Sequence, residues 1–342
     1  MTTTRGKGRF GSDGFLLSVE EDVELSLRLF QLNWIIIGLV LVLLTLGLML
    51  TNFRAEPKGY IIILGMTGLY GYFGHRNARS ERGNPRVYAT LFTLAQIILI
   101  FILVTSLGYI AASAAFPMQE ARLLAFDRAL GLDFRTYLSF VNDRPGLIRA
   151  LASAYSSIFI QLTLLVVLLP LCGLYRRAAE FVLSCALTLI ITTVISTLIP
   201  ATGVYHALGL LPADHRNIEP SVYYDTLREL PLVRDGTTRV LDAFRLGPLL
   251  TFPSFHAITA ILYAWALWPI RWLRVAGISW NTVVLAATPI GGGHFFVDVV
   301  AGVVIALATI YATHRLGKYL VRGQLRKRQP ALIPSHAAAN AT

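Results

Sequence analysis

The stretch LNWIIIGLVLVLLTLGLMLTN, residues 32–52, runs for 21 positions without a charged side chain. An α-helix needs about 20 predominantly apolar residues to cross the hydrocarbon core of a bilayer. Similar runs recur along the 342 residues, so that 55% of the chain is hydrophobic and only 14% is charged. Soluble domains carry about 25% charged residues. The composition therefore argues against a soluble fold and predicts a membrane protein with several spans.

Eight apolar runs with few or no charges are predicted to cross the membrane. They cover roughly residues 32–52, 58–74, 88–113, 154–174, 178–199, 252–270, 273–290 and 295–314. In lipid every backbone polar group needs a partner within the protein, so each span is expected to be a helix and no strands are expected. The predicted fold is an all-α, polytopic transmembrane helix bundle.

Basic residues fall at alternate ends of these spans. Arg28 precedes the first span, and further clusters begin at Arg76, Arg176, Arg271 and Arg315, after the second, fourth, sixth and eighth spans. Because cytoplasmic loops carry an excess of Lys and Arg, eight spans with both termini in the cytoplasm explain these positions. The same bias explains the net charge of +11. No aromatic-rich basic face indicates binding to nucleic acid.

Two polar motifs begin the sixth and eighth spans on the outer side of this topology. TFPSFHAITA contains Ser254 and His256, and GGGHFFVDVVAGVV contains His294 and Asp298. The sixth span enters the membrane and the seventh returns, so the two motifs are expected to meet. His294 and Asp298 are four residues apart, which places them on one face of a helix. The carboxylate can then accept a hydrogen bond from the imidazole and fix its tautomer.

Both helix starts suit a phosphate group. The glycines at 291–293 allow backbone N–H groups to approach an anion, which the helix dipole also favours. Pro253 suits a first helical turn, and the Ser254 hydroxyl can cap the helix or donate to a phosphate oxygen. A neutral imidazole is a nucleophile toward phosphorus, and a protonated one is an acid for the leaving alkoxide. His256, His294 and Asp298 therefore suffice for a double displacement through a phosphohistidine.

Other interpretations use the same side chains. A histidine at a helix end is commonly an interfacial polar residue, and glycine-rich turns are commonly only turns, but their conjunction on one side favours a site. Zinc could bind His256, His294 and Asp298, yet no further strong ligand stands at suitable spacing. We therefore expect neither a metal nor another cofactor.

The motifs PSFH at 253–256 and GGHFFVD at 292–298 resemble the second and third signature motifs of the type 2 phosphatidic acid phosphatase superfamily. The match looks closest to its inositol phosphorylceramide synthase-like branch, which PATG at 200–203 also resembles. The specific part of the resemblance covers roughly residues 197–305. It implies that His294 is the nucleophile, that Asp298 orients it, that His256 is the general acid and base, and that Ser254 helps hold the phosphate.

Two departures from the family pattern concern the cations that bind phosphate. The third motif usually has Ser-Arg before the histidine, and those positions are Ala287 and Thr288 here. In the first motif six residues separate a Lys from Arg-Pro, and Tyr137 stands at the position of that Lys relative to Arg144 and Pro145. The usual phosphate cations are therefore missing.

Three arginines of the outer loop are candidates to replace those cations. They are Arg234, Arg239 and Arg245, of which Arg234, in an RDG turn, is the first choice. The alternative is that Arg234 is a solvated loop charge. With Ser254 and Gly293, Arg234 completes the predicted substrate-binding set.

Three functions remain open on the sequence. The leading one is a lipid phosphate phosphatase, in which water attacks the phosphohistidine. The second is a lipid headgroup phosphotransferase with the same mechanism, in which an alcohol such as inositol replaces water. The third is a transporter or scaffold without chemistry. The one clear intramembrane acid, Asp298, lies near a surface beside a histidine, which favours an enzyme over a pathway of scattered charges.

The predicted functions divide the chain into four segments. Residues 1–31 form a cytoplasmic N-terminal segment, 32–153 accessory helices with an outer loop, 154–320 the catalytic bundle, and 321–342 a cytoplasmic tail. The expected partners are a lipid phosphate substrate and membrane lipids. The resemblance to bacterial relatives implies a bacterial inner membrane, with the site on the non-cytoplasmic side. The sequence does not indicate an oligomeric state.

Overall fold

The computed structural model describes residues 9–10, 16–17 and 19–328, with side chains described for residues 21–320. Helices occupy all eight predicted spans, which confirms the all-α fold class. These helices are α1 (Val19–Leu50), α2 (Pro57–Arg79), α3 (Pro85–Ala112), α7 (Ile158–Leu171), α8 (Tyr175–Leu198), α11 (Phe255–Leu267), α12 (Arg274–Gly292) and α13 (Phe296–Arg328). The two long outer loops contain shorter helices, which are α4 (Glu120–Ala129), α5 (Phe134–Asn142), α6 (Pro145–Ser156), α9 (Val204–Ala207) and α10 (Ser221–Arg234), with a 3₁₀ turn at Pro212–His215.

Four of the described helices are long and apolar enough to cross a membrane alone. They are α1, α3, α8 and α13, and a fifth span results if α6 and α7, which meet at a 45° bend, are taken together. The 13 residues of α11 give a helix of about 20 Å, shorter than the hydrocarbon core of about 30 Å. The fold is therefore a membrane helix bundle, while eight spans with cytoplasmic termini stay a prediction.

Several predicted segment boundaries fall inside helices. Residues 153 and 154 both belong to α6, because Pro145 occupies the first turn and starts this helix before the apolar run. The predicted N-terminal segment 1–31 includes the beginning of α1 from Val19, and the predicted tail 321–342 includes the end of α13. The remaining residues of that tail, 329–342, lie outside the described residues.

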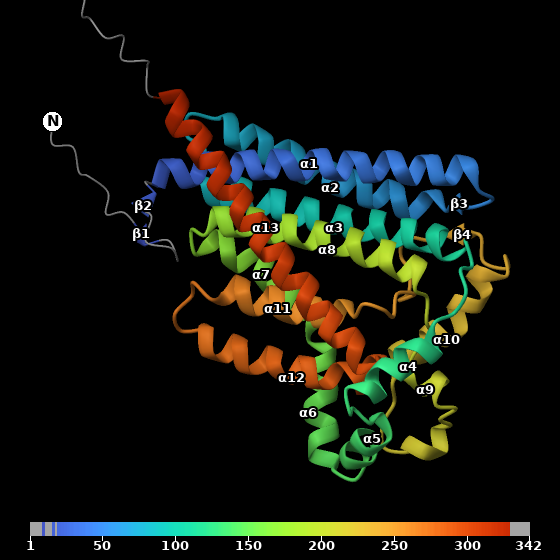
Figure 1. Cartoon of the computed structure of the whole chain (residues 1–342). Coiled ribbons are helices and arrows are strands. Elements are labelled where there is room, and N and C mark those ends of the chain that lie inside the picture. The colour runs from blue at the N-terminus through green and yellow to red at the C-terminus, as the bar shows by residue number, and fades with distance from the viewer. Residues whose placement is uncertain (1–8, 11–15, 18, 329–342) are drawn as a thin grey trace, which may run out of the picture.

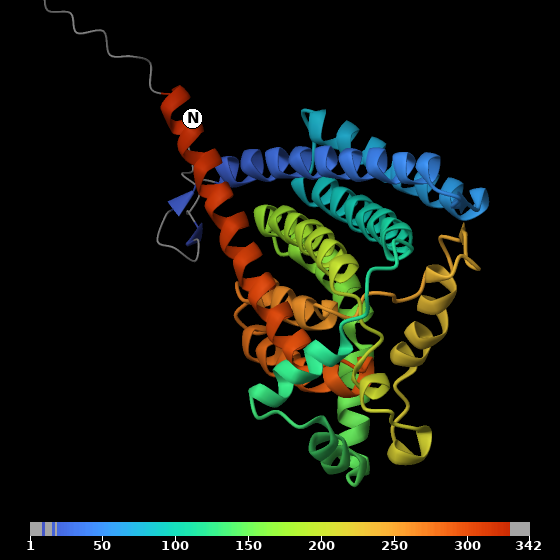
Figure 2. The ribbon, with the colours of Figure 1, turned by 45° about the vertical axis from the view of Figure 1, so that its right-hand side comes forward.

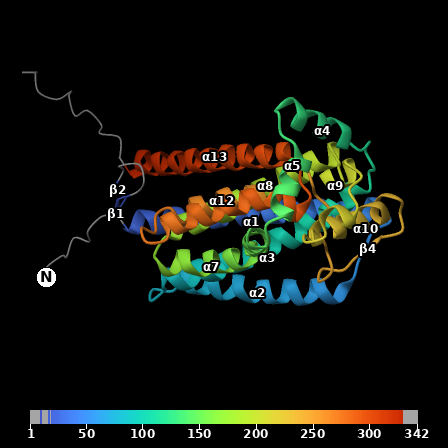
Figure 3. The ribbon, with the colours of Figure 1, turned by 90° about the horizontal axis from the view of Figure 1, so that it is seen from below.

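The long helices run side by side, and the loop helices gather at one end of the bundle (Figures 1 and 3). There α4, α5, α9 and α10 surround the beginning of α13, while the beginning of α1 and the end of α13 lie at the opposite end. The two ends of the described bundle thus lie at the same end of the molecule. Turning the view shows α13 crossing beside α11 and α12 toward the loop helices (Figure 2).

Polar side chains join the long helices inside the bundle. The Asn33 side chain of α1 donates to the Gln96 side chain of α3 and to the Ala179 carbonyl of α8, each at 3.2 Å. Around this contact α8 is buried along most of its length, with Ala178, Ala179 and Phe181 fully enclosed. Small residues allow helix backbones to approach closely, and interhelical hydrogen bonds help association where water is absent.

Short strands are present, although none were expected. β1 (Arg9–Phe10) pairs antiparallel with β2 (Leu16–Leu17), and β3 (Arg54–Ala55) pairs parallel with β4 (Val240–Leu241). All four lie outside the predicted spans, so the rule against sheet edges in lipid does not apply to them. The β3–β4 contact joins the α1–α2 turn to the long loop before α11, which places these two predicted outer loops on the same side.

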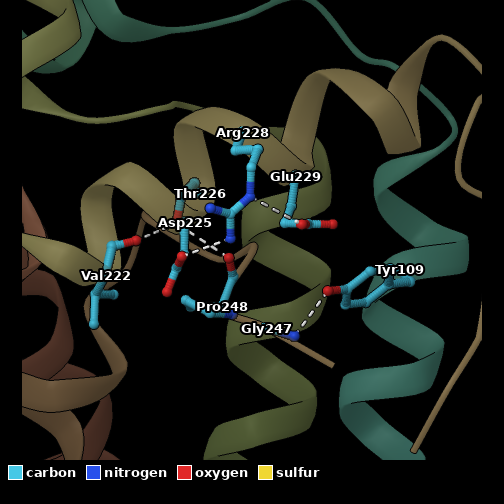
Figure 4. Close-up of polar contacts among 8 residues, drawn as sticks. All are labelled: Tyr109, Val222, Asp225, Thr226, Arg228, Glu229, Gly247 and Pro248. Carbon is cyan, nitrogen blue, oxygen red and sulfur yellow. Dashed lines mark hydrogen bonds and ion pairs between the residues drawn. The ribbon is translucent and has the colours of Figure 1, made fainter. Parts of the chain in front are cut away.

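Two side chains fix the segment that leads into α11 (Figure 4). The Tyr109 hydroxyl of α3 accepts a hydrogen bond from the Gly247 N–H at 2.8 Å, and the Thr226 hydroxyl of α10 donates to the Pro248 carbonyl at 3.1 Å. These bonds hold the chain just before the motif that contains Ser254 and His256. The first polar motif is thus anchored from both α3 and α10.

Candidate active site

His294 and Asp298 form a buried pair at the beginning of α13. The Nδ1 atom of His294 lies 3.2 Å from Oδ2 of Asp298, and the same Oδ2 accepts the Phe295 N–H at 3.0 Å. His294 is only 4% exposed and Asp298 is fully buried. His294 precedes the first residue of α13, so the pair spans the helix start. With Nδ1 directed at the carboxylate, Nε2 is the ring nitrogen left for chemistry.

The beginning of α11 packs directly against this pair. The Ser254 N–H donates to the Asp298 carbonyl at 3.1 Å, and the Ser254 hydroxyl accepts the Ala257 N–H at 3.4 Å as the helix cap. Gly302 permits the close approach, because a Cβ at that position would lie 2.6 Å from the Ser254 carbonyl oxygen. The two polar motifs, 38 residues apart at their histidines, therefore meet as their topology predicted.

His256 is partly exposed and stacks on Tyr155 of α6. The two ring centroids are 3.9 Å apart, with only 9° between the ring planes. The hydroxyl of the same tyrosine lies near His294, because a Cβ on Gly292 would be 2.6 Å from that hydroxyl and 2.8 Å from Nε2 of His294. The sequence placed residue 154 at the beginning of a span but gave no sign that Tyr155 would face the histidines. Its contact partners lie more than 100 positions away in the chain.

The three glycines lie where packing restricts the space for a side chain. Gly291 and Gly292 belong to the last turn of α12, where a Cβ on Gly291 would lie 2.7 Å from the Tyr155 ring. Gly293 ends that helix in the left-handed conformation, with φ of 66°, which favours glycine. Its carbonyl accepts the Val204 N–H at 2.7 Å. Gly293 therefore turns the chain between α12 and α13, and its binding of phosphate stays a prediction.

The beginning of α13 is occupied by a second carboxylate, which the sequence did not predict. Both oxygens of Asp127, in α4, accept backbone N–H groups, from Phe296 at 2.9 Å and from Val297 at 2.8 Å. The Asp127 side chain is 1% exposed. Burial raises the pKa of its carboxyl, and the two N–H donors oppose that rise. Carboxylates are stabilised at helix N-termini, so Asp127 takes the position that the sequence suggested for a substrate anion.

Replacing Asp127 with alanine is expected to destabilise the protein and lower turnover. Two N–H groups of α13 would lose their partner, at a cost of roughly 2–4 kcal/mol. The apparent melting temperature in detergent should fall, and His294, held by the same helix start, should lose alignment. The matched control is Asp143→Ala, at an exposed aspartate that ends α5. Equal melting temperatures for the two variants would contradict the capping role of Asp127.

Arg234 does not lie beside the histidines. Its guanidinium donates to the Phe116 carbonyl at 2.8 Å. At the other end of α10, Tyr223 packs against Gly293. Tyr223 and Arg234 are eleven positions apart, which amounts to about 16 Å along the helix. The length of α10 therefore separates Arg234 from Gly293, and its binding of phosphate stays a prediction.

Three other arginines of this loop have partners away from the histidines. Arg239 donates to the Val233 and Thr238 carbonyls, and Arg245 lies 3.4 Å from the Asp242 carboxylate. Arg228 pairs with two acids of its own helix (Figure 4). None of these contacts, among the residues with described side chains, involves His256, His294 or Asp298. The predicted substitutes for the missing cations are thus not assembled at the site.

The positions that depart from the family motifs are used for packing. Tyr137, at the position of the usual Lys, donates its hydroxyl to the Ala286 carbonyl at 2.7 Å. Thr288 is fully buried and donates to the Val284 carbonyl within α12, and Ala287 is also buried. These contacts tie α5 to α12 and leave no cation at either motif position.

Comparison with known proteins agrees with the motifs. None of the curated proteins and none of the solved structures matches the chain. A family model described as the PAP2 superfamily matches residues 121–312. This match covers more than half of the chain and includes both polar motifs, Tyr155 and Asp127. The chain therefore belongs to the PAP2 superfamily, whose members are phosphatases and phosphotransferases.

Proposed function

We propose that the protein is an integral membrane lipid phosphate phosphatase that acts through a phosphohistidine at the non-cytoplasmic surface. The observation that carries this proposal is the buried His294–Asp298 pair, 3.2 Å apart, with His256 of α11 beside it. Membership of the PAP2 superfamily supports a phosphoryl-transfer reaction on a phosphate ester. That the substrate is a lipid, and that the reaction passes through a phosphohistidine, are proposals that go beyond family membership.

In the first step Nε2 of His294 attacks phosphorus and the bond from phosphorus to the leaving oxygen breaks. His256, protonated, gives its proton to that oxygen, which leaves as an alcohol. Asp298 stabilises the positive charge that the ring of His294 gains, because its carboxylate lies against Nδ1 in a buried site. The phosphate ester is the only reactant in this step, which yields the phosphoenzyme and the free alcohol.

In the second step His256, now neutral, takes a proton from water. The resulting hydroxide attacks phosphorus, the P–N bond breaks, and inorganic phosphate leaves. His294 and His256 return to their initial states. Ser254 contributes by holding α11 against α13, since its N–H bonds to the Asp298 carbonyl. Its hydroxyl hydrogen remains for a phosphate oxygen.

The position of the site supports an amphipathic substrate. His256 and His294 lie near the beginnings of α11 and α13, at the end of the bundle where the loop helices gather (Figure 1). A headgroup can reach this level while acyl or prenyl chains stay in lipid. The positive-inside pattern of the sequence supports a non-cytoplasmic location for this end. We place the protein in a bacterial inner membrane on the family resemblance of its motifs.

A second candidate is a lipid headgroup phosphotransferase, as in the inositol phosphorylceramide synthase-like branch. A cleft of about 350 Å³ lies between α4, α5 and the end of α9, and Asp127 lines it while capping α13. This cleft adjoins the beginning of α13 and suits a polar alcohol that would accept the phosphoryl group. An alcohol bound there would replace water in the second step and form a new phosphodiester.

The test uses purified protein in detergent with a panel of lipid phosphates and phosphodiesters. Free phosphate and lipid products are both measured, with and without inositol and other alcohols. Free phosphate that is absent from Asp298→Asn would support the phosphatase, and a headgroup-exchanged lipid formed only with added alcohol would favour the transferase. No turnover by a folded parent across the panel would favour the transporter or scaffold.

A further inference from the structure

The buried side chain of Tyr155 lies beside both histidines, and it takes no part in the two proposed phosphoryl-transfer steps. Tyr155 is 6% exposed, and its ring lies parallel to that of His256. Its hydroxyl has no hydrogen-bond partner among the described residues. Most buried polar groups in proteins are hydrogen-bonded, because an unpaired one has lost its contact with water. The orphaned hydroxyl therefore indicates the position of a ligand.

The hydroxyl lies close to the reactive nitrogen of His294, on the same side of Gly292. A Cβ placed on Gly292 would lie 2.6 Å from the Tyr155 hydroxyl oxygen and 2.8 Å from Nε2 of His294. The two atoms thus flank one point beside Gly292, which has no side chain to fill it. They do not bond to each other, since the hydroxyl has no partner. A group attached to Nε2 would come within reach of the hydroxyl.

The site also needs a donor of this kind. A phosphoryl group in transfer carries negative charge on its non-bridging oxygens, and donors fixed in a site that excludes water stabilise that charge strongly. The family's cations are missing here, and Arg234, Arg239 and Arg245 bond elsewhere. The α13 N–H groups of Phe296 and Val297 are taken by Asp127. Among the described residues the Tyr155 hydroxyl is therefore a buried donor without a partner beside His294, in addition to the Ser254 hydroxyl, whose oxygen already accepts the Ala257 N–H.

We propose that Tyr155 is a catalytic residue whose hydroxyl donates a hydrogen bond to a non-bridging oxygen of the phosphoryl group on its way to and from His294. The inference rests on the proposed phosphohistidine function. The hydroxyl keeps its proton throughout, so no bond to Tyr155 forms or breaks. Its ring has a second task, which is to hold His256 by stacking where it can reach the leaving oxygen.

The test compares Tyr155→Phe, which keeps the ring and removes the hydroxyl, with Tyr155→Leu, which removes both. With the lipid phosphate that the parent hydrolyses best, kcat/KM should fall roughly 10- to 100-fold for Tyr155→Phe. The Leu variant should lose more, since His256 is then unsupported. Inhibition by inorganic vanadate, which adopts the geometry of a phosphoryl group in transfer, should weaken about tenfold in Tyr155→Phe.

The matched control is Tyr88→Phe, which removes a buried hydroxyl bonded to Ser26 in the half of the bundle opposite the site. It should keep parental kcat/KM and vanadate inhibition. The inhibition constant does not depend on the folded fraction of a preparation, so it separates loss of a phosphate contact from loss of folded protein. A Tyr155→Phe variant with parental kcat/KM and parental vanadate inhibition would overturn the role of Tyr155 alone. A parent that hydrolyses no phosphate ester and is not stabilised by vanadate would overturn the proposed function and this inference together.

Discussion

Replacing His294 with alanine is expected to abolish formation of a phosphoenzyme and to lower turnover by at least about 10⁴-fold. Alanine removes the nitrogen that would bond to phosphorus, and no described side chain near the site can take its place. His256 is the imidazole beside it, but its ring stacks on Tyr155 and accepts no contact from a carboxylate among the described side chains. The buried Asp298 carboxylate contacts His294, with Oδ2 at 3.2 Å from Nδ1.

The measurement is the capture of the intermediate itself. Enzyme is mixed with a lipid phosphate carrying a radioactive phosphoryl group and quenched, and the labelled protein is then tested for its linkage. A phosphohistidine is labile to acid and stable to alkali, unlike a phosphoserine. The parent and His256→Ala should carry this label and His294→Ala should not. The control is His75→Ala, at an exposed histidine of α2, which should label like the parent.

The outcome also separates the two histidines. Label in His294→Ala but not in His256→Ala would exchange the roles assigned to them. Turnover in the parent without any labelled protein, at times shorter than one turnover, would argue for direct attack by water. In that case His294 would act as a base, and the double displacement would be wrong.

The sequence predicted the long helices well because their signal is local. Residues 32–52 carry no charge, and such a run has few alternatives to a helix in lipid. The bend between α6 and α7 was not predicted, because it occurs at Ser157, which gives no strong helix-stop signal. The 13-residue length of α11 also escaped the sequence, since its apolar composition continues past Leu267, where the helix ends.

The candidate site was predictable where its residues are close in sequence. His294 and Asp298 are four residues apart, and the chain reversal through α12 brings His256 to them. The role of Asp127 was not predicted, because it caps a helix that starts 169 positions later. A single aspartate in the sequence does not indicate so distant a partner. The role of Tyr155 was not predicted for the same reason, since its neighbours His256 and His294 are both distant in the sequence.

The glycines at 291–293 have a packing role that the sequence did not indicate. Glycine is unfavourable in helices, so three in a row favoured a loop that cradles an anion. In the structure two of them end α12, where the Tyr155 ring and the His294 ring leave no room for a side chain. The glycines themselves can be read from the sequence. The Tyr155 and His294 rings that lie against them could not be predicted from it.

This crowding makes Gly292→Ala the second variant with a large expected effect. The new Cβ would lie 2.5 Å from Cδ2 of His294, 2.6 Å from the Tyr155 hydroxyl and 2.8 Å from Nε2 of His294. Contacts this short require movement, yet His294 is bound to Asp298 and Tyr155 is stacked on His256. A displacement of about 1 Å at a reacting group costs roughly 100-fold in rate, and we expect turnover to fall at least that far. Overpacking should also cost about 1–3 kcal/mol of stability.

Gly65→Ala, in α2, is the matched control for this variant. Nothing lies within 4 Å of the position that its Cβ would take, so the same substitution there should leave turnover unchanged. It should raise stability slightly, by about 0.5–1 kcal/mol, because alanine favours a helix over glycine. Turnover at fixed enzyme concentration and melting temperature in detergent distinguish the two variants. Parental turnover in Gly292→Ala would mean that His294 and Tyr155 stand further apart during the reaction, because their present positions leave no space for that methyl group.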